Sequence, residues 1–144
     1  MLGGTFGPTE KRTEGGPPKK QWYMSRIPGV FEEVVLSAMA GQPVFLVGAF
    51  GDVAKLLIDL IRKILREEAT LEYQRQAPFA PEMKQIYLDR GLPWWDYAEM
   101  VNLLHQKGFA GINPTLSEQE QVELAETLDF SQILELLLKG LNIS

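Results

Sequence analysis

Three glycine-containing turns are the segments of this sequence whose residue types suit the binding of an anion. They are residues 2–5 (Leu-Gly-Gly-Thr), 27–33 (Ile-Pro-Gly-Val-Phe-Glu-Glu) and 47–52 (Val-Gly-Ala-Phe-Gly-Asp). Glycine lets a ligand approach the backbone closely, and free N–H groups at a helix start attract a phosphate. If the turns share one edge of an α/β sheet, they form a single ligand site. The third turn also fits a plain tight connection between a strand and a helix.

Two adjacent carboxylates, Glu32 and Glu33, follow the second turn in the first turn of a predicted helix. The helix dipole favours acidic residues there, which is the structural explanation. The functional explanation is that one of them accepts hydrogen bonds from ribose hydroxyls. Asp52 has the same two interpretations, as a helix N-cap or as part of the site.

Other candidate chemistry is sparse. The chain has no cysteine and one histidine, which excludes zinc-finger, iron–sulfur and cysteine-nucleophile classes. His105 lies beside Leu104 without a visible partner nucleophile or second ligand, so we expect it to pack. Trp94 and Trp95 could stack on a base, but we expect one or both to be buried against the helical tail. We therefore assign no catalytic residue, no metal ligand and no cofactor.

Composition and net charge limit the classes of protein to which this chain can belong. The 144 residues are 45% hydrophobic and 23% charged, as in an ordinary globular domain. Five basic residues against two acidic ones give the first 26 residues about +3, so the net charge of −5 leaves about −8 on the rest. An acidic body repels polyanions, so we expect no nucleic-acid partner. With neither a signal peptide nor an apolar run long enough to cross a bilayer, we expect a cytoplasmic protein without membrane contact.

The spacing of the apolar residues predicts the helices and strands, and Gly and Pro residues mark where they begin and end. Residues 7–26 are rich in Gly, Pro, Thr and Lys and predict a long loop without helix or strand. A helix over 30–40, a buried parallel strand over 43–47 and a helix over 53–68 follow. The rest of the chain is predicted to be helical. The first two of these helices cover residues 81–90 and 94–107. The next begins at a capping box of Ser117 and Glu120 and ends near 127, and the last begins at Asp129 or Ser131 and is terminated by Gly140.

This order predicts an α/β fold, a partial Rossmann-like parallel sheet with helices on both faces and a helical C-terminal tail. We divide the chain into the C-terminal part of a Rossmann-like core over 1–70 and a helical C-terminal extension over 71–144 that packs on this core. Met1 and Leu2 would end a preceding strand. Two strands are too few for a parallel sheet, so we expect the sheet to be completed by a missing N-terminal part or by a second copy in a homo-oligomer. The less favoured alternative is an all-α bundle with residues 43–47 as a linker.

The turns at 2–5, 26–33 and 41–51, with the tail at 115–120 and 133–141, resemble the SLOG superfamily, a Rossmann-like group. The similarity is greatest to its prokaryotic branch, which is related to the N-terminal domain of melastatin-type TRP channels. The resemblance implies a site for a nucleotide-derived small molecule such as an ADP-ribose relative. The residues it assigns to ligand binding are Gly3, Gly4, Thr5, Pro28, Gly29, Glu32, Glu33, Gly48, Phe50 and Gly51.

Two differences from the family bear on activity. The family's Gly-Gly-Phe-Gly-Gly is Gly-Ala-Phe-Gly-Asp over 48–52, which adds a methyl group and a negative charge at the phosphate edge. The related phosphoribohydrolases carry Pro-Gly-Gly-x-Gly-Thr-x-x-Glu where this chain has Pro28 to Glu33 without the extra Gly and Thr. We therefore expect a ligand sensor, with a nucleotide N-glycosidic hydrolase and a purely structural fragment as the alternatives.

Overall fold

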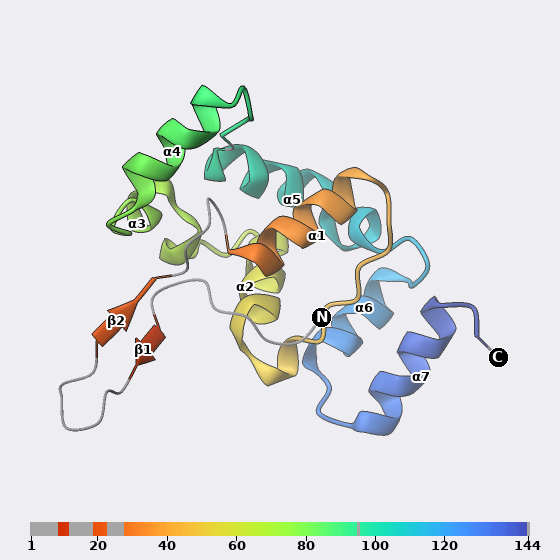
Figure 1. Cartoon of the computed structure of the whole chain (residues 1–144). Helices are drawn as coiled ribbons and strands as arrows, with labels where there is room; N and C mark the ends of the chain where they lie inside the picture. Colours follow the sequence, from red (N-terminus) through yellow and green to blue (C-terminus); the bar gives the residue numbers. More distant parts are fainter. Residues whose placement is uncertain (1–8, 12–18, 23–27, 95, 144) are drawn as a thin grey trace.

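The computed structural model describes residues 9–11, 19–22, 28–94 and 96–143. Helices make up most of this part of the chain (Figure 1). In chain order the elements are β1 (Thr9–Lys11), β2 (Lys19–Gln21), α1 (Gly29–Met39), the 3₁₀ helix η1 (Gly48–Phe50), α2 (Asp52–Ile61), the 3₁₀ helix η2 (Glu67–Ala69), α3 (Leu71–Gln74), α4 (Ala80–Asp89), α5 (Tyr97–Ile112), α6 (Glu118–Glu126) and α7 (Phe130–Gly140).

The predicted Rossmann-like parallel sheet with helices on both faces is wrong. The one sheet among the described residues is a two-stranded antiparallel hairpin of β1 and β2, with Glu10 opposite Lys20. It stands beside the helices at the lower left of Figure 1. The hairpin also falls inside residues 7–26, where we expected neither helix nor strand. The strand proposed at Met1 and Leu2 lies outside the described residues.

Residues 43–47 explain why the fold class differs from the prediction. This segment is extended, and Val44, Leu46 and Val47 are buried as expected of a core strand. However, the Val44 N–H donates to the Ile112 carbonyl at 3.0 Å, and the Val44 carbonyl accepts from the Asn113 side-chain amide at 3.2 Å. A β-strand requires a neighbouring strand with which to form a ladder. The segment is instead a buried linker tied to the end of α5, as in the all-α alternative.

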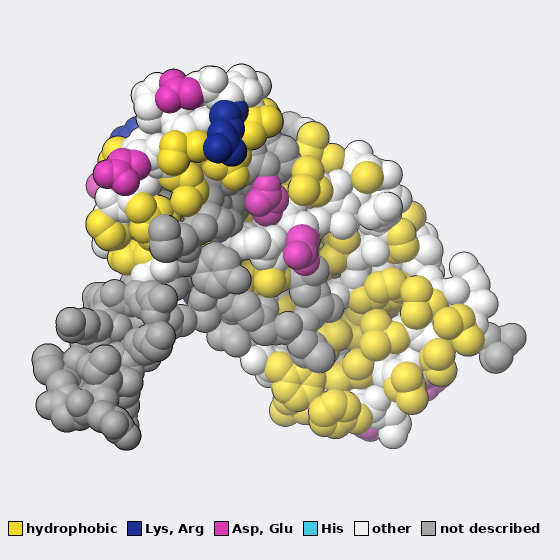
Figure 2. All heavy atoms as spheres, in the orientation of Figure 1, with side chains coloured by type: hydrophobic (Ala, Val, Ile, Leu, Met, Phe, Trp, Pro, Cys, Tyr) yellow, Lys and Arg dark blue, Asp and Glu magenta, His cyan; other side chains and the backbone are white. Residues whose placement is uncertain are grey.

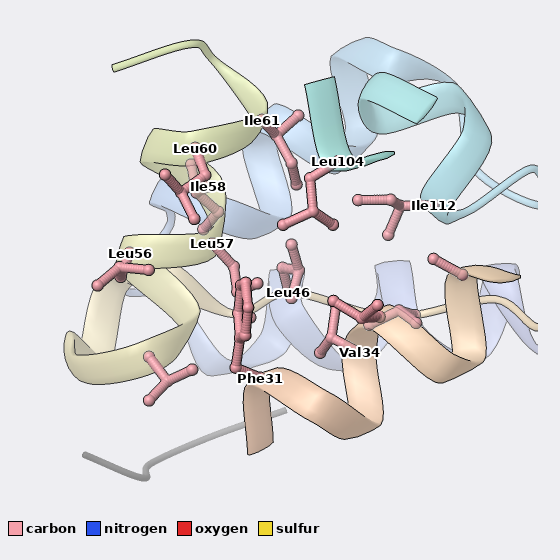
Figure 3. Close-up of a cluster of buried hydrophobic side chains, with 14 of the residues drawn as sticks. Phe31, Val34, Leu46, Leu56, Leu57, Ile58, Leu60, Ile61, Leu104 and Ile112 are labelled. Atoms are coloured by element: carbon pink, nitrogen blue, oxygen red, sulfur yellow. The ribbon is translucent and has the colours of Figure 1, made fainter. Parts of the chain in front are cut away.

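The main core is formed by the apolar faces of α1, α2 and α5. Phe31 of α1, Leu57 of α2 and Leu104 of α5 are completely buried and point into the same cluster (Figure 3). The buried positions of α1 recur at the i, i+3, i+4, i+7 spacing from which the helix over 30–40 was predicted. That helix is confirmed with its start one residue earlier. The core therefore holds the N-terminal turn of α1 firmly in place.

The second predicted helix is shorter than expected. α2 ends at Ile61 rather than near 68, because Lys63 has a φ of +61°, which a helix does not accept. The following residues turn back, and Arg66 donates from Nη1 to the Asp59 carboxylate of α2 at 2.5 Å. Leu65, which the helical pattern placed on an apolar face, is 90% exposed.

The C-terminal helices pack as a pair next to the core. The predicted capping box is confirmed, because Ser117 and Glu120 bond reciprocally at the start of α6, and Asp129 caps α7. Gly140 was expected just beyond the last helix, but it is the final residue of α7. A Cβ on Gly140 would clash with the Phe45 ring, so glycine is needed there for close packing rather than for ending the helix.

An ion pair between α6 and α7 predicts a pH dependence. The hydrogen bond from Lys139, followed by those of Ser117, lowers the pKa of Glu120 from 4.5 to about 2. A carboxyl group with a lowered folded-state pKa stabilises the fold above its unfolded pKa, and this contribution disappears as the pH falls through the folded value. We therefore expect the thermal midpoint of the wild type to approach that of Glu120→Gln between pH 4.5 and about 2.

Circular dichroism melting of the two proteins across that range is the measurement. Glu118→Gln is the matched control, because Glu118 lies on the same turn and is exposed. A difference in midpoint between wild type and Glu120→Gln that stays constant over this range would contradict the assigned pairing.

Candidate functional site

The N-terminal turn of α1 presents unused backbone donors. Phe31 and Glu32 donate their N–H groups to the Pro28 carbonyl at 2.9 and 3.1 Å. Pro28 is the N-cap and supplies no side-chain hydrogen bond, and the N–H groups of Gly29 and Val30 have no partner within the described part of the chain. Both residues are partly exposed. Such a helix start suits an anion, because its free N–H groups and the helix dipole act together.

Tyr97 lies against this turn. It is the first residue of α5, and its ring stacks on Phe31 with the centroids 6.3 Å apart and the planes at 9°. Figure 1 shows the two helices side by side with their N-terminal ends toward the same side. Asp96 fixes the start of α5 by accepting the Ala98 N–H at 2.8 Å. The packing of α5 on α1 thus places a phenol beside the α1 N-terminus.

The Tyr97 hydroxyl is an unusual group in this core. Tyr97 is 3% exposed, and its hydroxyl has no hydrogen-bond partner among the described residues. Burial and then the negative charge of Glu32 raise the pKa of Tyr97, so the hydroxyl keeps its proton at neutral pH. A buried tyrosine hydroxyl normally finds a partner. Here the ring that carries the hydroxyl stacks on Phe31, in the first turn of α1.

The structure separates the two predicted carboxylates. Glu32 is half-buried on the α1 turn and close enough to Tyr97 to influence its ionisation. Glu33, one residue later, is exposed. Pro28, Gly29, Glu32 and Tyr97 therefore come together at one helix start. Tyr97 was missed by the sequence analysis because an aromatic residue at a helix start is typical of a core position.

The turn over 48–51 is held mainly by α2 and α6. Gly48 is buried, and a Cβ there would lie 2.8 Å from the Ala125 carbonyl oxygen of α6. Gly51 has a φ of +83° and is the N-cap of α2, a place predicted for Asp52. The Phe50 ring lies 5.5 Å from that of Phe130 at the start of α7. These contacts give the turn a packing role, whereas its expected ligand contact remains a prediction.

Three predicted site residues, Gly3, Gly4 and Thr5, lie outside the described residues. Within the residues that the structure describes, no group of three or more His, Asp or Glu side chains is placed to hold a metal ion. No helix there has the length and apolar character needed to cross a membrane.

Comparison with models of known protein families gives a match over most of the chain. The family model of SLOG cluster2 matches residues 15–124, which is more than half of the chain. The matched range contains Pro28 to Glu33, Gly48 to Gly51 and Tyr97. No curated protein and no solved structure matches the chain. The family match is compatible with a domain that binds a nucleotide-related ligand, and it bears out the resemblance seen in the sequence.

Proposed function

The chain belongs to the SLOG superfamily, and on that premise we propose that it is a sensor domain for a nucleotide-derived small molecule of the ADP-ribose type. The proposed site is the N-terminal turn of α1 with Glu32 and Tyr97. A phosphate oxygen would accept hydrogen bonds from the N–H groups of Gly29 and Val30. The ribose hydroxyls would donate to the Glu32 carboxylate.

The observation that carries the proposal is the buried Tyr97 hydroxyl, which has no partner within the described residues. Leaving a buried hydroxyl without a hydrogen bond costs about 1–3 kcal/mol. A phosphate or ribose oxygen that accepts from this hydroxyl would recover that cost. Because the hydroxyl keeps its proton, it acts as a neutral donor and adds no second negative charge to a site that must accept an anion.

Glu32 and Glu33 are adjacent carboxylates, so substituting each one separately tests the site. We expect Glu32→Gln to weaken ADP-ribose binding by about tenfold, the loss of roughly 1.4 kcal/mol expected for a charge-assisted hydrogen bond. Glu33→Gln removes the same charge from an exposed position and should change the affinity by less than about twofold. Isothermal titration of ADP-ribose and of nucleoside monophosphates into the three proteins measures this difference.

The same samples distinguish the alternative functions. A sensor binds saturably and leaves the nucleotide intact, which chromatography of the mixture after titration would show. Release of the free base would instead indicate the N-glycosidic hydrolase. Absence of saturable binding for all of these nucleotides, or equal losses for the two glutamate variants, would contradict the proposal.

A further inference from the structure

Helix α7 has a second apolar face that the fold leaves uncovered. Ile133, Leu136 and Gly140 are buried against the body of the protein. Phe130, Leu134, Leu138 and Leu141 recur at i, i+4, i+8 and i+11 on an adjoining face, and Phe130 is 72% and Leu134 57% exposed. The apolar surface of α7 is therefore wider than the part that packs within the chain.

Neighbouring side chains extend this face into a continuous surface. Phe50 contacts Phe130, Leu128 precedes α7, and Ile143 follows it. Figure 2 shows the resulting apolar area at the lower right, over α6 and α7. We call this surface the α7 patch, and its members are Phe50, Leu128, Phe130, Leu134, Leu138, Leu141 and Ile143.

The size of the α7 patch fits a protein interface. Its seven side chains expose on the order of 600 Å², against roughly 800 Å² buried by each partner in an interface of standard size. Exposed apolar areas beyond a few hundred Å² are uncommon on monomers. No acidic or basic residue is a member of the patch, so its centre can be desolvated without burying a charge.

We propose that the α7 patch is the contact surface of a homodimer in which two copies of α7 pack antiparallel about a twofold axis. The spacing of the α7 residues in the patch is self-complementary. If the twofold axis passes near residue 136, Leu134 of each copy contacts Leu138 of the other copy, and Phe130 of each lies near Leu141 of the other. The first apolar face of α7 stays on its own chain, where Lys139 is bonded to Glu120.

The charge around the patch gives the dimer a defined salt dependence. Residues 113–144 carry six carboxylates and one lysine. Lys139 pairs with Glu120 and Arg62 pairs with Glu126, so Glu118, Glu123, Asp129 and Glu135 are left without an ion pair among the described residues. Two acidic rims repel each other, and salt screens that repulsion. Dimerisation of this chain should therefore strengthen as the salt concentration rises. An interface built on ion pairs would weaken instead.

Sedimentation equilibrium of the full chain over a range of protein and salt concentrations tests the proposal. We expect a reversible dimer whose dissociation constant falls with added salt and rises at least about 100-fold in Leu134→Glu, because the variant buries an unpaired charge. Leu65→Glu is the matched control, since Leu65 is exposed outside the patch, and it should dimerise like the wild type. Unchanged far-UV circular dichroism shows that both variants fold.

Three results would overturn the proposal. They are a wild type that stays monomeric at every concentration and salt, a dimer that Leu134→Glu leaves intact, and a dimer that Leu65→Glu weakens equally. These measurements use no nucleotide. A result that overturns the dimer would therefore leave the proposed ligand site at the N-terminal turn of α1 untouched.

Discussion

Replacing Arg66 with methionine is expected to lower the free energy of unfolding by about 3 kcal/mol. The Asp59 carboxylate is only 11% exposed and accepts from Arg66 Nη1 at 2.5 Å. Removing the guanidinium leaves the mostly buried Asp59 carboxylate, and the Glu68 carboxylate beside it, without their counter-ion. Urea denaturation followed by circular dichroism measures the loss.

Two further variants identify the cause of that loss. Glu126→Gln breaks the exposed pair between Arg62 and Glu126, whose carboxylate side chain is 61% exposed, and should cost less than about 1 kcal/mol. In the double variant Asp59→Asn with Arg66→Met, the buried charge is gone and part of the stability should return. If Arg66→Met costs no more than Glu126→Gln, the ion pair does not hold residues 62–66 against α2.

Replacing Gly48 with alanine is expected to destabilise the protein by about 2 kcal/mol. The added methyl group would lie 2.8 Å from the Ala125 carbonyl oxygen in the last turn of α6, and this backbone atom cannot move aside without disturbing the end of that helix. Thermal or urea unfolding of the variant measures the cost.

Gly29→Ala is the matched control for Gly48→Ala. A Cβ on Gly29 meets no atom of the described residues within 4 Å, so the fold should tolerate alanine at the first position of α1. The methyl group would nevertheless occupy space beside the N–H groups proposed to bind phosphate, so ADP-ribose binding should weaken while stability is kept. The opposite pattern, with Gly48→Ala stable and Gly29→Ala unfolded, would contradict the roles assigned to the two glycines.

Local signals in the sequence predicted the parts of the fold that depend on neighbouring residues. The apolar spacing of residues 31–38 predicted α1, and Ser117 with Glu120 predicted the start of α6. Both signals act within one or two helical turns, and here the contacts with the rest of the fold agree with them. The grouping of Pro28, Gly29 and Glu32 at a helix start was predicted for the same reason.

Long-range contacts decided what the sequence could not predict. Residues 43–47 have the composition of a core strand, but the bonds of Val44 to Ile112 and Asn113, more than 60 residues away, make them a linker. A glycine required by close packing and a glycine beside a ligand cannot be told apart in a sequence. The contacts with Ile58 and Ala125 are what distinguish Gly48 from Gly29. Tyr97 enters the candidate site because its hydroxyl is buried beside Glu32, which its residue type alone does not indicate.

The dissociation constant of ADP-ribose for Tyr97→Phe, compared with that for the wild type, tests the central claim most directly. The variant removes only the buried hydroxyl and keeps the ring stacked on Phe31. If the hydroxyl serves a ligand, the constant should rise about tenfold, while the thermal midpoint stays equal or increases because a costly buried group is gone. An unchanged dissociation constant would contradict the assignment of the ligand site to the N-terminal turn of α1.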